Sequence, residues 1–133
     1  SPLTGTTILD VGTGTGRAAI ALARRGATVT GIDASGEMLA VARRRALESG
    51  ASVTFVQGDA HRLNVADGSF DAVVCLRVLM HTPDWRRSLA ELCRTARHRV
   101  VLDYPARSSA AALQSIAWHA SRILVRGWFD SGW

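Results

Sequence analysis

The sequence contains no lysine, so all 16 of its basic residues are arginine. These arginines carry the net charge of +5 and are scattered along the chain instead of forming one basic run. Arginines on the polar faces of helices are ordinarily solvated surface, and charge alone is weak evidence for binding to nucleic acid. We therefore do not expect a nucleic-acid partner.

Cysteine is scarce, and long apolar runs are absent. Cys75 and Cys93 are the only cysteines, and their separation excludes the Cys-x-x-Cys pair that many zinc sites use. No apolar run approaches the roughly 20 residues that a bilayer span needs, and the first residues lack the regions of a secretory signal peptide. We expect no metal site, no membrane span, two reduced and buried thiols, and a cytoplasmic location.

The length and composition are those of one globular domain. The chain has 133 residues, of which 47% are hydrophobic and 20% are charged. A chain of this size can bury a core without disulfides or metals. We therefore expect a single domain over residues 1–133.

Strand-like and helix-like segments alternate along this domain. Strands are expected at 8–11, 27–32, 53–56, 70–76 and 99–104. Helices are expected at 17–25, from the N-cap Ser35 to Gly50, after Asp84, and from Ser108 or Ser109. This order predicts an α/β fold: a doubly wound, mainly parallel sheet with helices on both faces. The core would span 7–104, followed by a helical, tryptophan-rich tail over 105–133.

Such a sheet binds ligands beyond the carboxyl ends of its strands. The first strand ends in the glycine-rich segment 10–16, Asp-Val-Gly-Thr-Gly-Thr-Gly. Alternate glycines allow a tight turn and close approach of a ligand to the backbone. A dinucleotide-binding oxidoreductase would use Gly-x-Gly-x-x-Gly, but the third glycine comes one residue early and Arg17 follows it. Asp10 is also a poor neighbour for a pyrophosphate and a good one for an ammonium group.

Three further strand ends carry suitable residues. Asp33 ends the second strand, where a carboxylate can accept hydrogen bonds from ribose hydroxyls. Asp59 and Ala60 follow the third strand, where an acid can accept from the adenine amine and a backbone N–H can donate to the ring. Met38 could pack on the adenine, although it could equally be a core residue. Residues 76–81 follow the fourth strand, where methyl donor and acceptor would meet.

Four segments resemble, in order, the motifs of class I S-adenosylmethionine-dependent methyltransferases of the UbiE-like, or type 11, group: 8–16, 31–39, 58–60 and 78–81. The resemblance covers roughly residues 7–104. It implies a Rossmann-like core, S-adenosylmethionine as cofactor, S-adenosylhomocysteine as product, and transfer of the sulfonium methyl to an acceptor, with a small molecule favoured.

The resemblance also implies the role of each cofactor-binding residue. Asp10 would lie near the methionine ammonium, and Leu76 would touch the methionine part. Asp33 would hold the ribose hydroxyls. The remaining residues would line the methionine and ribose (Gly12, Gly14 and Gly16), flank the adenine (Ala34 and Met38) or read its edge (Asp59 and Ala60).

Alternative interpretations remain for several of these residues. Asp10 and Asp59 could be turn residues, and Asp33 could serve as a helix-entry cap. His81 is a weak candidate for a general base, and we favour a structural or substrate-shaping role for it. No catalytic residue is therefore assigned. Two other function classes stay open: a non-catalytic cofactor-binding or partner-activating module, and a nucleotide-binding oxidoreductase.

The chain departs from the family after its fifth strand, where members usually add an antiparallel hairpin. Only 29 residues follow Tyr104, and most of them have a helical pattern rich in tryptophan. We therefore expect the antiparallel strands to be missing and the fifth strand to be an exposed edge. An exposed edge and an aromatic tail favour self-association into a homo-oligomer.

Overall fold

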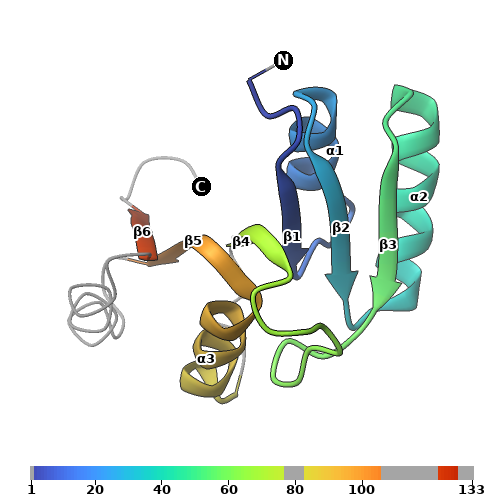
Figure 1. Ribbon diagram of the computed structural model, residues 1–133. Helices are drawn as coiled ribbons and strands as arrows, with labels where there is room; N and C mark the ends of the chain where they lie inside the picture. The colour runs from blue at the N-terminus through green and yellow to red at the C-terminus, as the bar shows by residue number, and fades with distance from the viewer. Residues whose placement is uncertain (1, 77–82, 106–122, 129–133) are drawn as a thin grey trace.

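The computed structural model describes residues 2–76, 83–105 and 123–128. Their elements, in chain order, are β1 (Thr7–Val11), α1 (Arg17–Arg24), β2 (Thr28–Asp33), α2 (Gly36–Ser49), β3 (Val53–Gln57), β4 (Phe70–Cys75), α3 (Trp85–Thr95), β5 (Ala96–Pro105) and β6 (Ile123–Trp128). The strands form one sheet in the order β3-β2-β1-β4-β5-β6, and every pairing between them is parallel (Figure 1). The order reverses between β1 and β4, so the predicted doubly wound fold is confirmed.

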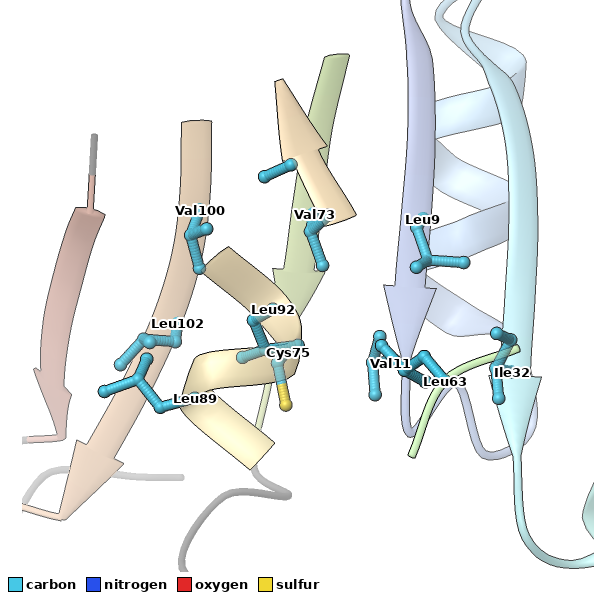
Figure 2. Packing of buried hydrophobic residues seen from close by; sticks show 11 residues of the cluster. Leu9, Val11, Ile32, Leu63, Val73, Cys75, Leu89, Leu92, Val100 and Leu102 are labelled. Carbon is cyan, nitrogen blue, oxygen red and sulfur yellow. The ribbon is translucent and has the colours of Figure 1, made fainter. Parts of the chain in front are cut away.

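Helices cover both faces of this sheet. Successive side chains of a strand point to opposite faces, so the apolar strands present two faces that helices must bury. On one face Ile8 packs in a cluster with Ile20 of α1 and Leu39 of α2. On the other face a second cluster includes Leu89 and Leu92 of α3, which Figure 2 shows beside Leu102 of β5 and Cys75 of β4. The central strands β1 and β4 are thus largely buried, whereas β3 at the edge of the sheet is largely exposed.

The helix starts follow local sequence signals. Gly16 is the N-cap of α1 and has a φ of 84°, in the left-handed region that favours glycine. The Ser35 hydroxyl accepts a hydrogen bond from the Met38 N–H at 3.2 Å, and the Asp84 carboxylate accepts from the Arg87 N–H at 3.2 Å. Both predicted side-chain caps are therefore confirmed.

The expectation of an exposed fifth strand is wrong. β6 pairs with β5 in parallel register from Val100↔Ile123 to Pro105↔Trp128, so backbone hydrogen bonding covers that edge. The tail is accordingly not helical throughout, because residues 123–128 form a strand. The helix expected from Ser108 or Ser109 lies outside the described residues. The described strands pair only in parallel, and the absence of the antiparallel hairpin stays a prediction.

Two smaller differences concern the α3–β5 unit. β5 begins at Ala96, directly after α3, which is earlier than the predicted start at Arg99. Cys75 is buried as expected, but Cys93 is exposed because Leu89 and Leu92 occupy the inward face of α3. Among the described residues, none of the helices combines the length and the hydropathy that a membrane-spanning helix requires.

Candidate functional site

A cavity of about 200 Å³ lies where the carboxyl ends of β1 and β2 meet the loop after β3. It is lined by Val11, Gly12, Ile32, Asp33, Ala34, Gly58, Asp59, Ala60, His61 and Pro83. Pockets for whole drug-sized ligands measure roughly 300–1,000 Å³, so this cavity suits one part of such a ligand. Five residues predicted from three separate strand ends therefore line one cavity: Gly12, Asp33, Ala34, Asp59 and Ala60.

The glycine-rich segment after β1 turns sharply over the end of β2. The N–H groups of Gly12 and Thr13 both donate to the Ile32 carbonyl, at 2.8 and 2.9 Å. Gly12 and Gly14 have φ angles of 73° and 57°, a conformation that side chains disfavour. The turn thus presents backbone at the cavity where a side chain would otherwise stand.

Gly16 has a different task from Gly12. A Cβ added at Gly16 would lie 3.1 Å from the Ala42 Cβ and 3.1 Å from the Phe55 Cζ. The absence of a side chain therefore lets α1 start close against α2 and β3. Gly16 does not line the cavity, and its contacts are those of a packing residue.

Asp33 ties together the two chain segments beside the cavity. Its Oδ2 accepts a hydrogen bond from the Gly14 N–H at 2.8 Å, and its Oδ1 accepts from the Ser35 N–H at 2.9 Å. A carboxylate has about four acceptor sites, so each oxygen can still accept from a ligand hydroxyl. Asp33 is therefore a residue of the cavity wall and not the cap of α2, which is Ser35.

Asp10 is buried, and only 3% of its surface is exposed. Burial raises the pKa of Asp10 to about 6; the hydrogen bond from the Thr13 hydroxyl at 2.8 Å opposes this rise, and the nearby Asp33 charge adds to it. A positive charge close to a buried carboxyl group stabilises its ionised form relative to its protonated form. Asp10 lies behind the glycine turn and does not line the cavity.

Asp59 and His61 form a small hydrogen-bonded unit in the cavity wall. Asp59 Oδ1 accepts from the His61 N–H at 2.8 Å and lies 2.9 Å from His61 Nδ1. These contacts, the backbone hydrogen bond foremost, lower the pKa of Asp59, so its carboxylate acts as an acceptor at neutral pH. The first contact is an Asx turn, so the turn interpretation and the position in the wall both hold.

His61 and Pro83 are cavity residues that the sequence analysis missed. The Asp84 N–H donates to His61 Nε2 at 3.3 Å, which requires the ring hydrogen on Nδ1, facing Asp59. His61 follows directly after the predicted 58–60 segment, and that proximity was its available signal. Pro83 carried no signal, because only the folded chain brings the start of α3 to this cavity.

Five of the predicted cofactor-binding residues are not part of the cavity lining: Asp10, Gly14, Gly16, Met38 and Leu76. Met38 is 43% exposed, and its Cε lies 4.0 Å from the place of a Cβ on Gly14, so it covers the glycine turn and is not a core residue. Leu76 follows β4 and is 36% exposed. His81 lies outside the described residues. Within the described part of the chain, no group of three His, Cys, Asp or Glu residues is arranged to hold a metal ion.

The sequence of this chain is similar to a known protein family and to individual proteins. The family described as "Methyltransferase domain" matches residues 8–99. A ubiquinone biosynthesis O-methyltransferase of Pseudomonas paraeruginosa is 49% identical over 83 residues, which cover 62% of this chain and 36% of that protein. The chain thus spans little more than a third of the length of this relative.

Two solved structures share the fold. The magnesium protoporphyrin IX methyltransferase of Synechocystis PCC 6803, solved with bound S-adenosylmethionine, has a TM-score of 0.78 and 30% identity, over 87% of this chain and 59% of that one. The 4+2 cyclase SpnF has a TM-score of 0.69 and 34% identity, over 74% of this chain and 40% of that one. One sheet architecture therefore occurs in proteins that are named for different reactions.

Proposed function

This chain belongs to the methyltransferase domain family, and on that premise we propose that it binds S-adenosylmethionine and transfers its methyl group to a small-molecule acceptor. The observation that carries the proposal is the convergence of Gly12, Asp33 and Asp59 from three strand ends on one cavity. A doubly wound sheet binds nucleotides at this place, beside the reversal of strand order.

The residues present fit the adenosine half of this cofactor. The cavity is narrow, and a Cβ on Gly58 would come within 2.9 Å of Ile32 Cγ2, so the backbone there must stay bare. Asp33 offers carboxylate acceptors suited to ribose hydroxyls, and Asp59 offers one suited to the adenine amine. Both acids lie in the wall of the same cavity.

Asp10 fits the amino-acid half. Its carboxyl is buried next to the glycine turn, and burial raises its pKa to about 6. An ammonium group brought close to it would favour the ionised form and gain a charge-assisted interaction. The proposed site thus has an acidic end at Asp10, suited to the ammonium group, and a nucleoside end at Asp33 and Asp59.

When bound, S-adenosylmethionine supplies a methyl group on a positively charged sulfur, which leaves as a neutral thioether once the acceptor takes the methyl. The chain's own residues then have to align the reactants and exclude water. We assign no general base, since alignment alone suffices where the acceptor is already a nucleophile. The names of the two methyltransferase relatives support a small organic acceptor. A cytoplasmic location stays our proposal, in keeping with a sequence that contains only two cysteines.

A second candidate function is binding of the same cofactor without methyl transfer. The likeness to SpnF favours it, because that protein is named as a cyclase. Binding and turnover must therefore be measured separately.

The first experiment is calorimetric titration with S-adenosylhomocysteine of the parent, of Asp33→Asn and of Glu48→Gln. Glu48 is an exposed carboxylate on α2, so its variant is a matched control for the loss of one negative charge. We expect saturable binding by the parent, affinity lower by roughly ten- to a hundredfold in Asp33→Asn, and no change in Glu48→Gln. Absence of binding by a folded parent would overturn the proposal, as would equal affinity of the two variants.

A turnover assay separates the two candidate functions. The parent is incubated with S-adenosylmethionine carrying a labelled methyl group and with phenolic and carboxylic acid acceptors. Label transferred to an acceptor, together with release of S-adenosylhomocysteine, supports the methyltransferase. Tight binding with no transfer to any acceptor favours the binding module.

A further inference from the structure

The loop between β3 and β4 forms the wall of the cavity although it belongs to no helix or strand. Its residues 58–61 line the cavity, and the chain then runs from Arg62 to Ser69 along α3. Backbone groups outside regular structure need other hydrogen-bond partners, and these partners decide how rigid a loop is.

Arg94 of α3 supplies such partners along the loop. Its guanidinium donates to the Leu63 carbonyl at 2.9 Å and to the Val65 carbonyl at 2.7 Å. It also donates to the Asp67 carboxylate at 2.7 Å. One side chain therefore contacts three alternate positions of the loop, which the planar fork of arginine allows and the single ammonium of lysine does not.

Glu91, one turn earlier on α3, completes the attachment. Its Oε2 accepts a hydrogen bond from the Leu63 N–H at 2.8 Å, so both peptide groups of Leu63 are held by this ion pair. Arg94 donates to both Glu91 oxygens, from Nε at 3.0 Å and from Nη2 at 2.9 Å. This bidentate geometry is the strong form of such a pair, and 19% of the Glu91 side chain is exposed.

A short chain of contacts connects Leu63 to the cavity. Leu63 is buried in the cluster on α3, and Ala60 packs against the same cluster. The Arg62 N–H donates to the Asp59 carbonyl at 3.0 Å, which closes the turn that begins at Asp59. The turn is held again at its middle, where His61 accepts from the Asp84 N–H at the start of α3.

We propose that Glu91 and Arg94 are positioning residues of the cofactor site, which hold the turn at Asp59 rigidly enough to discriminate adenine from other purines. The inference rests on the proposed function. Asp59 accepts a hydrogen bond at neutral pH, so it matches the amine of adenine and opposes the carbonyl of hypoxanthine. That selection is sharp only if the loop cannot move aside, because a mobile loop adapts to either base.

The experiment compares two ligands, S-adenosylhomocysteine and S-inosylhomocysteine, which differ at the purine amine. The variants are Arg94→Met, Arg94→Lys and Glu91→Gln. Arg97→Met is the matched control, because Arg97 forms an ion pair with Asp71 at 3.4 Å on the exposed surface of β5 and β4, away from the cavity. Circular dichroism checks that each variant is folded, and exchange of the Leu63 amide hydrogen is measured without ligand.

We expect the parent to prefer the adenine ligand and Arg94→Met to lose about tenfold in affinity for it. Selectivity is the dissociation constant of S-inosylhomocysteine divided by that of S-adenosylhomocysteine. This ratio should fall towards one in Arg94→Met, fall less in Glu91→Gln, and stay at the parent value in Arg97→Met. Arg94→Lys should not restore the ratio, because charge without the fork does not hold the loop. The Leu63 amide should exchange faster in Glu91→Gln than in Arg97→Met.

Two results would overturn the positioning role while leaving the proposed function intact. The first is equal weakening of both ligands in Arg94→Met, which indicates general loss of stability. The second is a parent that binds both ligands equally. A folded parent that binds neither ligand overturns the proposed function instead. The exchange measurement needs no ligand, so an unchanged exchange rate of the Leu63 amide in Glu91→Gln overturns the attachment of the loop by itself.

Discussion

Replacement of Asp10 by asparagine should make the ligand-free protein more stable and at the same time weaken cofactor binding. The ordinary pKa of this carboxyl is 3.8, and burial raises it to about 6 in the folded protein. That difference corresponds to about 3 kcal/mol of unfavourable free energy for keeping Asp10 ionised in the folded state. Asparagine has nearly the same shape and can still accept the hydrogen bond from Thr13, but it has no charge to bury.

The sign of the pH dependence follows from proton binding. Between pH 3.8 and about 6 the folded protein keeps a proton on Asp10 that the unfolded chain has released. The free energy of unfolding therefore falls as the pH rises through this window, and the loss is complete above the folded pKa. Asp10→Asn lacks this loss, so its advantage over the parent should grow by about 2 kcal/mol from pH 4 to pH 7.

Denaturant unfolding at several pH values measures this advantage, with Glu48→Gln as a control for an exposed carboxylate. Titration with S-adenosylhomocysteine over the same range measures binding, which should strengthen with pH in the parent as Asp10 ionises and should stay weak and flat in Asp10→Asn. A stability difference that is constant with pH would refute the account of Asp10 burial. Binding by Asp10→Asn with the parent's affinity and pH dependence would refute its role towards the ammonium group.

Two further predictions concern the sheet. Gly31→Ala should destabilise the protein by about 1–3 kcal/mol, because the new Cβ would lie 2.7 Å from Thr13 Oγ1 and 2.8 Å from Phe55 Cδ1; an unchanged denaturation midpoint would contradict this. Removal of residues 123–133 should expose the β5 edge that β6 now covers and cause self-association, detectable by sizing at increasing concentration. A shortened chain that elutes as the parent does at every concentration would contradict it.

Much of the fold could be predicted because its signals are local. Alternation of apolar segments gave the order of strands and helices up to β5, and Ser35 and Asp84 marked helix starts through their own side chains. Parallel connection then follows from that order, since helices between strands imply crossovers on the faces of a sheet. β6 could not be found in this way, because a parallel pair joins segments distant in the chain and leaves no local turn signal.

The candidate site was likewise predicted in part from local sequence signals and decided in part by the folded chain. The sequence by itself determined that glycines and the acids Asp10, Asp33 and Asp59 stand at strand ends, because polar residues directly after buried strands are visible without coordinates. Only the tertiary structure decided how these residues are used. In the folded chain Asp10 is buried, Gly16 packs against α2 and β3, and His61 lines the cavity.

The tertiary structure alone also revealed the attachment of the cavity wall to α3. Glu91 and Arg94 read in the sequence as the solvated face of a helix, and nothing local distinguishes them from other charged helix residues. Their partners are backbone groups nearly 30 positions earlier in the chain. Every peptide carries the same donor and acceptor, so sequence cannot show which side chain will meet which peptide, and only the folded path of the loop decides it.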